Sequence, residues 1–339
     1  MAERIRIIDI AEELGLSTAT VSNVIHGKTK KISDETVKRV QQLLEQKQYI
    51  PSMAGILLAQ NDSRIVGIVI NNHEKYENRV LEDPFIASSL NALSMELEQA
   101  GYFMMVKTTT QWNEIIRFAS MWNMEGLVLI GFCERDYRKL RESMHIPFVV
   151  YDGYFEETER ICNIIIDNSD GGIQVGSYLR KMGHRKVLCI ADNNICVDKE
   201  RMDGCKSALE GDSEIQSGFL MLPFAKARRR RFYEEYFDYI MSFTAVFAVS
   251  DFYAIELLHF LQEKGVKIPE DISIVGFDDT PWCEKVYPAL TTVKQDAGER
   301  AKLAVTILQE LKTGECEKKH VKLAVKLVER SSVRCISDQ

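Results

Sequence analysis

A short stretch near the N-terminus combines small polar side chains with an aliphatic stripe at helical spacing. Val21, Val24 and Ile25 fall on one face of a helix over residues 18–25. The other face carries hydroxyl, methyl and amide groups, which are slim enough to enter the major groove of DNA. An asparagine amide there can pair with adenine through two hydrogen bonds, and a methyl group can contact thymine. The residues of this face are Thr18, Ala19, Ser22 and Asn23.

Capping residues predict three short helices between residues 5 and 50. Asp9–Leu14 ends at Gly15, a residue suited to a left-handed helix end. Ser17 can cap the second helix, and Ser33 can cap a third that has acidic residues in its first turn. Two helices joined by a tight turn and closed by a third are typical of a helix-turn-helix unit. An ordinary three-helix bundle without a partner is the alternative.

Residues 51–62 form a predicted connector with an unusual composition for a linker. Ile56, Leu57 and Leu58 are three adjacent large apolar residues, whereas linkers are normally polar. Such a segment either packs on a second copy of the chain or inserts an apolar wedge into a DNA minor groove.

From residue 64 onward, apolar strand-like runs alternate with amphipathic helical stretches. This alternation is typical of parallel sheets covered by helices on both faces. Nine strands are too many for one comfortable open sheet of this type, so two doubly wound lobes with a cleft between them are expected. The predicted strands are 65–70, 102–107, 126–132, 147–151, 163–166, 186–191, 218–222, 245–249 and 272–277, and clear helices cover 87–99, 171–182 and 253–264.

Composition and charge exclude several classes of protein. The net charge of −7 argues against a surface that binds polyanions everywhere, but residues 1–60 hold eight Lys/Arg against seven Asp/Glu and are the less acidic part. No apolar run is long enough to cross a membrane, and no secretory signal precedes the first helix, so a cytoplasmic location is expected. Eight cysteines without a C-x-x-C pair predict reduced, buried thiols, and the histidines show no metal-ligand spacing. We therefore expect neither a metal site nor a cofactor.

An ordered series of motifs resembles the lactose/galactose-repressor family over nearly the whole chain. One match would be weak, but the series follows the family order from the N-terminal helices to the last strands. The motifs include Leu14-Gly15-Leu16-Ser17-Thr18-Ala19-Thr20-Val21-Ser22-Asn23, Tyr49-Ile50-Pro51, Asp83-Pro84-Phe85, Gly183-His184-Arg185, Gly276-Phe277-Asp278-Asp279 and Pro288-Ala289-Leu290-Thr291-Thr292.

The resemblance assigns roles to the predicted DNA-reading residues. It places Thr18, Ala19 and Asn23 at base-reading positions, and it makes Thr20 and Ser22 phosphate-positioning or helix-orienting hydroxyls. Leu58 matches the leucine that family members insert into the central minor groove. The sequence departs from the family at Ile56, where an arginine is common, and at Leu57, where a small residue is common. Loss of the arginine charge should weaken the electrostatic attraction of the hinge to the minor groove.

The resemblance also implies an effector cleft and an assembly. Carboxylates accept hydrogen bonds from hydroxyls, arginine donates several, and aromatic faces stack on a sugar or planar ring. A sugar is the expected effector, and a purine-like ligand is the alternative. The family further implies a homodimer or a dimer of dimers on an operator of twofold symmetry. The implied effector contacts are Phe85, Asp152, Arg201, Phe224 and Asp278, with Ser250 and Gln295 less certain.

The expected domain organisation is an all-α headpiece followed by an α/β domain that resembles a periplasmic binding protein. Residues 1–50 form the helix-turn-helix unit, 51–62 the hinge and 63–339 the effector-binding and dimerisation domain. Within the last, lobe 1 takes about 64–167 and 295–320, and lobe 2 takes about 168–294 and 321–339.

Two further segments have open interpretations. The run Arg228–Arg231 could be a nucleic-acid patch, but a solvated helix face is the better explanation. The stretch Asn71–Leu81 is either a lid over the cleft or a simple loop.

Two other classes of function compete with the regulator. A solute-binding protein is disfavoured by the N-terminal helices and the missing signal. An enzyme is disfavoured because no G-x-S-x-G, P-loop or G-x-G-x-x-G motif occurs.

Overall fold

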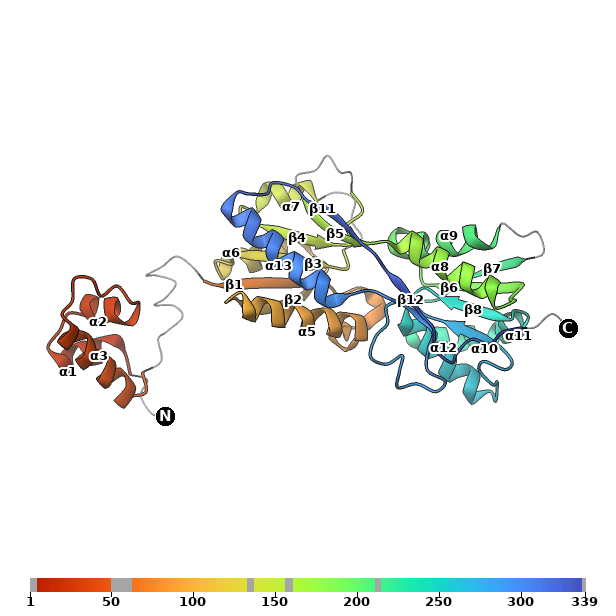
Figure 1. The fold of residues 1–339 in the computed structure, drawn as a ribbon, viewed down its shortest axis with the longest axis horizontal. Helices are drawn as coiled ribbons and strands as arrows, with labels where there is room; N and C mark the ends of the chain where they lie inside the picture. The colour runs from red at the N-terminus through yellow and green to blue at the C-terminus, as the bar shows by residue number, and fades with distance from the viewer. Residues whose placement is uncertain (1–4, 50–62, 133–136, 156–160, 211–214, 337–339) are drawn as a thin grey trace. The chain divides into compact units, whose positions relative to one another are not determined.

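A computed structural model describes residues 5–49, 63–132, 137–155, 161–210 and 215–336. The chain divides into two compact units, Met1–Ser63 and Arg64–Gln339. Figure 1 shows the first unit as helices alone and the second as sheets flanked by helices, which confirms the predicted fold class. No helix among the described residues is both long and apolar enough to span a membrane.

The N-terminal unit is built from three helices around a small core. They are α1 (Ile7–Leu14), α2 (Thr18–Ile25) and α3 (Asp34–Gln46). Gly15 ends α1 with a φ of 66°, a left-handed conformation that costs glycine little. Ser17 and Ser33 cap α2 and α3, and their hydroxyls accept from the backbone of Thr20 and Thr36. The buried core residues are Ile10, Ala11, Val21, Val24, Val40 and Leu43.

Lobe 1 of the second unit is a six-stranded parallel sheet in the order β11-β5-β4-β3-β1-β2. Helices α5 and α13 cover one face, and α6 and α7 the other (Figure 1). The strands are β1 (Ile65–Asn71), β2 (Phe103–Thr109), β3 (Gly126–Ile130), β4 (Phe148–Tyr151), β5 (Cys162–Ile166) and β11 (His320–Leu323). The helices are α5 (Pro84–Gln99), α6 (Trp112–Met121), α7 (Arg138–Ser143) and α13 (Ala297–Thr313), with 3-10 turns η1 (Glu74–Tyr76) and η2 (Val80–Glu82) between β1 and α5.

Lobe 2 repeats this architecture with a four-stranded parallel sheet in the order β7-β6-β8-β9. Helices α8 and α9 pack on one face, and α10, α11 and α12 on the other (Figure 1). The strands are β6 (Lys186–Ala191), β7 (Gln216–Met221), β8 (Ala245–Ala248) and β9 (Ser273–Val275). The helices are α8 (Asn168–Lys181), α9 (Cys196–Leu209), α10 (Lys226–Glu235), α11 (Phe237–Met241) and α12 (Asp251–Glu263). A separate antiparallel pair joins β10 (Thr292–Lys294) to β12 (Lys326–Val328).

The structure corrects two expectations. Residues 321–323 were expected in lobe 2, but they continue β11 beside β5 of lobe 1, because this edge of the sheet still has unpaired backbone groups. The cysteines are not all reduced and buried, since Cys335 is exposed and Cys196 is disulfide-bonded. Cys196 begins α9 and lines the cleft, so it is half-buried instead of enclosed in an apolar run.

Candidate functional site

The polar face of α2 is presented to solvent. Val21 and Val24 lie in the core of the N-terminal unit, whereas Thr18, Ala19 and Asn23 are exposed. Ser22 is half-buried beside them. An exposed helix face of hydroxyl, methyl and amide groups has the donors and acceptors needed to read base edges in a major groove.

Thr20 differs from its neighbours because its hydroxyl is already engaged. Its Oγ1 lies 2.9 Å from Ser17 Oγ, and its backbone N–H donates to the same oxygen at 3.1 Å. Thr20 therefore fixes the start of α2, which supports the helix-orienting role over the phosphate-positioning one. Leu58, together with Ile56 and Leu57, lies outside the described residues.

A cavity of about 410 Å³ lies between the two lobes of the second unit, at the carboxyl ends of β1, β3, β4, β6 and β8. This volume is typical of small-molecule sites, and the position is the usual one for ligands in open parallel sheets. The structure brings six of the seven predicted effector residues to its wall: Phe85, Asp152, Arg201, Phe224, Ser250 and Asp278. The seventh, Gln295, does not line the cavity but donates from Nε2 to Asp278 Oδ1 at 2.6 Å.

Arg201 and Asp278 form a buried ion pair in the lobe-2 wall. Arg201 Nη1 donates to Asp278 Oδ1 at 3.3 Å, and both side chains are less than 10% exposed. Arg201 is held from three sides by Asn168 Oδ1, by the carbonyl of Val249 and by the ring of Phe277, 3.8 Å below its guanidinium.

The backbone around this pair is also constrained. A Cβ at Gly172 of α8 would lie 2.1 Å from the Arg201 carbonyl oxygen, so only glycine lets α9 approach closely enough. Burial and the charges of Asp251 and Asp83 raise the pKa of Asp278, while Arg201 lowers it.

Asp152 occupies the lobe-1 wall in a related arrangement. Its Oδ2 accepts from Arg300 at 2.7 Å, while its Oδ1 is buried without a partner among the described residues. A buried acceptor without a partner implies a ligand or water at that point. Asp152 has a φ of 56° and Asp278 a φ of 130°, conformations that non-glycine residues rarely adopt. Strained backbone of this kind is concentrated at functional sites.

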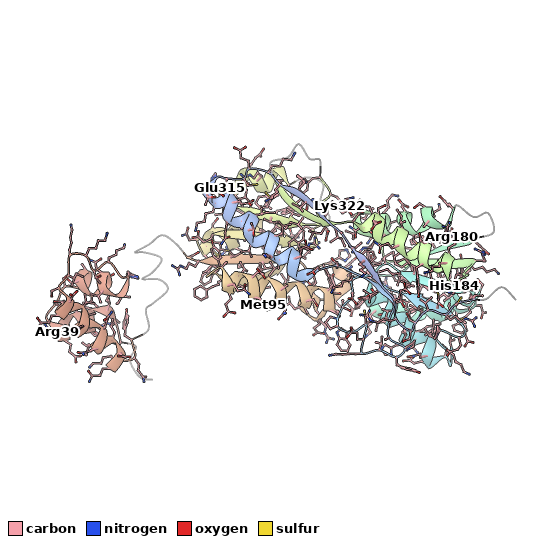
Figure 2. All side chains as sticks on the ribbon, viewed as in Figure 1. Arg39, Met95, Arg180, His184, Glu315 and Lys322 are labelled. Atoms are coloured by element: carbon pink, nitrogen blue, oxygen red, sulfur yellow. The ribbon has the colours of Figure 1, made fainter. Side chains whose placement is uncertain are left out.

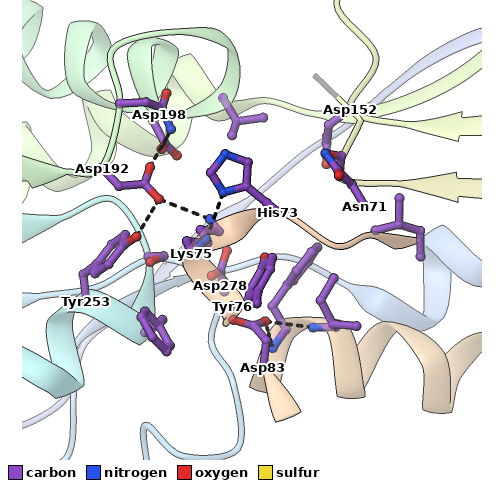
Figure 3. A pocket seen from close by; sticks show the side chains of 18 of the residues that line it. Asn71, His73, Lys75, Tyr76, Asp83, Asp152, Asp192, Asp198, Tyr253 and Asp278 are labelled. Atoms are coloured by element: carbon purple, nitrogen blue, oxygen red, sulfur yellow. Dashed lines mark hydrogen bonds and ion pairs between the residues drawn. The ribbon is translucent and has the colours of Figure 1, made fainter. Parts of the chain in front are cut away.

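A second acidic group at the lobe-2 end of the cavity was not found by sequence reasoning. Asp192 follows β6, and Tyr253 donates to its Oδ2 at 2.5 Å (Figure 3). Asn193 Nδ2 bridges Asp192 Oδ1 at 2.5 Å and Asp198 Oδ2 at 2.6 Å. Lys75, from the loop after β1, places its Nζ 3.5 Å from Asp192 Oδ2. The sequence carried a signal for Asp192 alone, which directly follows the predicted strand 186–191, where cleft residues of parallel sheets lie.

Protonation in this group follows from burial and mutual charge. Burial and the charge of Asp192 raise the pKa of Asp198 to about 7, although Lys75 lowers it. Burial alone would raise the pKa of Asp192, but Lys75 and the Tyr253 hydroxyl outweigh it and lower this pKa. Burial and Lys75 lower the pKa of His73, so its ring is neutral and accepts from the Lys75 backbone N–H. Several perturbed pKa values in one cleft are a mark of functional sites.

Comparisons with known proteins agree with this two-part arrangement. The sequence model "Bacterial regulatory proteins, lacI family" matches residues 6–52, and "Periplasmic binding protein-like domain" matches residues 177–333. The chain is 29% identical over 357 residues to the HTH-type transcriptional repressor PurR of Vibrio atlanticus, covering 98% of this chain and 99% of that protein. It is 28% identical over 324 residues to the ribose operon repressor of Haemophilus influenzae, covering 90% and 91%.

Solved structures show the same fold. The Lac repressor dimer bound to operator and the anti-inducer ONPF has a TM-score of 0.83 at 22% identity, covering 98% of this chain and 100% of that one. A LacI family transcriptional regulator from Enterococcus faecium with bound ribose has a TM-score of 0.69 at 22% identity, covering 80% and 100%. The chain therefore has a DNA-binding domain of the lacI family of bacterial regulatory proteins at residues 6–52, followed by a periplasmic-binding-protein-like domain that the family model matches over residues 177–333.

Proposed function

We propose that the chain is a transcription regulator that binds a specific double-stranded operator and responds to a small-molecule effector in the cleft. The observation that carries this proposal is the pairing, in one chain, of an exposed polar α2 face with a cavity that is lined by buried charged side chains. The relatives named above are repressors, and we propose that this chain also represses. It acts by binding and not by catalysis, in the cytoplasm, where its DNA lies.

A sugar is the effector class that the cavity chemistry supports best. Five carboxylates line the cavity, and carboxylates accept hydrogen bonds from the hydroxyls of a polyol. Phe85 and Phe224 offer apolar faces for a sugar ring. The residues that line the cavity as acceptors are Asp83, Asp152, Asp192, Asp198 and Asp278.

A purine-like ligand is the second candidate. Several relatives carry the name PurR, and the aromatic rings of the cleft would also stack on a planar base. The two classes differ in the hydrogen-bond donors that they offer to the carboxylates, so a panel of both separates them.

We propose that the chain works as a homodimer on an operator of twofold symmetry. Met95 on α5 points away from lobe 1 (Figure 2), and Phe103 at the start of edge strand β2 is 59% exposed. In lobe 2, Phe219 and Met221 are exposed on β7, which is also an edge strand. Exposed apolar side chains on edge strands are candidates for burial against a second copy of the chain. The Lac repressor is a dimer in its structure with operator.

Effector and operator influence each other by linkage. If the effector prefers one degree of lobe closure, and closure changes how two copies present their N-terminal units, each ligand must alter the affinity for the other by the same factor.

A binding titration tests the proposal directly. Full-length protein is titrated against fragments of bacterial genomic DNA with random competitor, at several salt concentrations, with and without a panel of sugars and nucleobases. We expect one class of fragment to survive competition, a steep salt dependence, and a change in affinity with one panel member. Equal binding to all fragments with every panel member would contradict the proposal.

A further inference from the structure

The loop between β1 and α5 extends from lobe 1 across the mouth of the cleft to lobe 2. We call residues 72–79 the latch loop. Its ends are tied by a hydrogen bond from Asn72 Nδ2 to Asn78 Oδ1 at 3.0 Å. Tyr76, in η1, packs against the core of lobe 1. The loop is therefore a preformed part of lobe 1, of the kind that functional surface loops often take.

Three side chains of the latch loop contact lobe 2. Lys75 Nζ lies 3.5 Å from Asp192 Oδ2, and Glu77 Oε1 accepts from the backbone N–H of Lys226 at 3.0 Å. The ring of His73 packs edge-on against Phe224, with centroids 4.8 Å apart. These contacts are ionic, hydrogen-bonded and aromatic, and all of them join a residue of lobe 1 to a residue of lobe 2.

The surface of lobe 2 that contacts the latch loop is built around a buried arginine. Arg229 is only 1% exposed and pairs with Glu256 through two hydrogen bonds of 2.7 and 2.9 Å. Its Nη1 also donates to the Phe224 carbonyl, which fixes the residue against which His73 packs. One arginine of the run 228–231 thus has a structural role at the cleft.

The latch loop has open space on both of its faces. On the outer side lies a second cavity of about 540 Å³ between the loop and helices α10 and α12. Lys75, Tyr76 and Asp83 line both this cavity and the effector cavity. The latch loop therefore separates the two cavities.

We propose that the latch loop holds the two lobes together before any effector binds, and that Lys75 is a positioning residue that keeps the cleft preorganised through Asp192. A cleft already closed to this degree binds a ligand more tightly, because less of the binding energy is spent on closure. The effect on affinity rests on the proposed effector function, whereas the closure itself does not.

The test measures lobe contact in the full-length protein without effector. Lys75→Met removes the ammonium while keeping the chain length, and Lys75→Arg restores a cation as a rescue variant. Hydrogen–deuterium exchange is followed in peptides that cover residues 192–198 and 224–230. Lys75 does not touch the Lys226 amide, so faster exchange there in Lys75→Met reports the release of the whole loop.

We expect Lys75→Met to raise exchange in both peptides about tenfold and Lys75→Arg to return it toward the wild-type value. Glu77→Ala should act like Lys75→Met. The matched control is Glu82→Ala, because Glu82 pairs with Arg79 within lobe 1 and takes no part in the three contacts with lobe 2 described above. Unchanged exchange in Lys75→Met, with the β1 and β6 peptides protected as in wild type, would overturn the proposal.

A second arm separates the latch from the effector function. With the panel member that binds wild-type protein, Lys75→Met should bind about tenfold more weakly in calorimetry. Equal affinity, despite faster exchange, would refute the preorganising role. If no panel member binds even wild-type protein while the exchange result holds, the proposed effector function is contradicted. The proposed role of the latch loop in lobe contact is then still supported.

Discussion

The reader, by which we mean helix α2 (Thr18–Ile25) with its polar face, and the effector cleft use side chains in opposite ways. On α2 the proposed base-reading residues Thr18, Ala19 and Asn23 are exposed, and the helix rests on a core of six small and aliphatic residues. In the cleft, Arg201 and Asp278 are buried, and each is held by groups from distant segments. A local motif is therefore enough to build the reader, whereas the cleft depends on the whole second unit. Mutations on α2 should consequently damage DNA recognition alone. Mutations in the cleft should damage both effector binding and the stability of the second unit.

The largest expected effect is the loss of Arg201. Arg201→Met leaves Asp278 buried without its cation, and breaking a buried pair in this way costs about 3–5 kcal/mol. Urea unfolding followed by tryptophan fluorescence measures this, because all three tryptophans, at 112, 122 and 282, belong to the second unit. Arg180→Met is the control, since Arg180 is exposed on α8 (Figure 2) and should change stability by less than about 0.5 kcal/mol. Equal effects of the two variants would remove the contrast between cleft and surface.

The next effect is a pH dependence confined to the second unit. His184 is fully buried, its Nδ1 lies 3.0 Å from Thr244 Oγ1, and burial lowers its pKa to about 4. The unfolded state, with a pKa of about 6.5, binds more protons between these values. The contribution of His184 to the free energy of unfolding is therefore complete above pH 6.5, and it decreases by about 3 kcal/mol as the pH falls through 4.

The pH effect is measured as a difference between variants, because other groups titrate in the same range. Asp198, with its pKa raised to about 7, contributes with the opposite sign. His184→Gln should lose stability less steeply than wild type between pH 6.5 and 4, and His259→Gln, an exposed site in the same lobe, should follow wild type. Parallel curves for His184→Gln and wild type would show that His184 does not carry the effect.

A smaller and purely functional effect is expected on α2. Asn23→Ala removes an exposed amide and should relax discrimination at one position per half-site by about 1–3 kcal/mol without changing stability. Titration against single-base operator variants measures it. Lys28→Ala is the comparison. Lys28 is an exposed cation just after α2, so its loss is expected to weaken binding to all operators alike and to lower the salt slope by about one. Unchanged discrimination in Asn23→Ala would refute the base-reading assignment.

The smallest effect concerns the basic run on α10. Arg228 and Arg231 are exposed, while Arg230 pairs with Glu234 and Glu263, so the run belongs to a solvated helix with one buried member. Arg228→Ala combined with Arg231→Ala should leave operator affinity within about twofold and the salt slope unchanged. A reduced salt slope of operator affinity would assign a DNA contact to the second unit, and DNA binding would then not be confined to α2.

Much of the fold followed from the sequence, with one systematic gap. The long apolar runs and the caps at Ser17 and Ser33 predicted the main elements, and each lies within a few residues of its observed place. Strands β10, β11 and β12 were missed. They are only three or four residues long and mix lysine with valine, so they carry no period of their own. β11 takes its strand conformation by pairing with β5 at the edge of the lobe-1 sheet, and β10 and β12 take theirs by pairing with each other.

The sequence by itself determined the reader, because a helix, its caps and its two faces depend on residues within a few positions of each other. It also determined that two parallel sheets would face a cleft. Only the tertiary structure decided that Lys75 meets Asp192, more than one hundred residues away, and that Tyr253 and Asp198 join them. Such pairs leave no periodic signal, because the distance between two charges is set by how whole lobes pack and not by spacing along the chain.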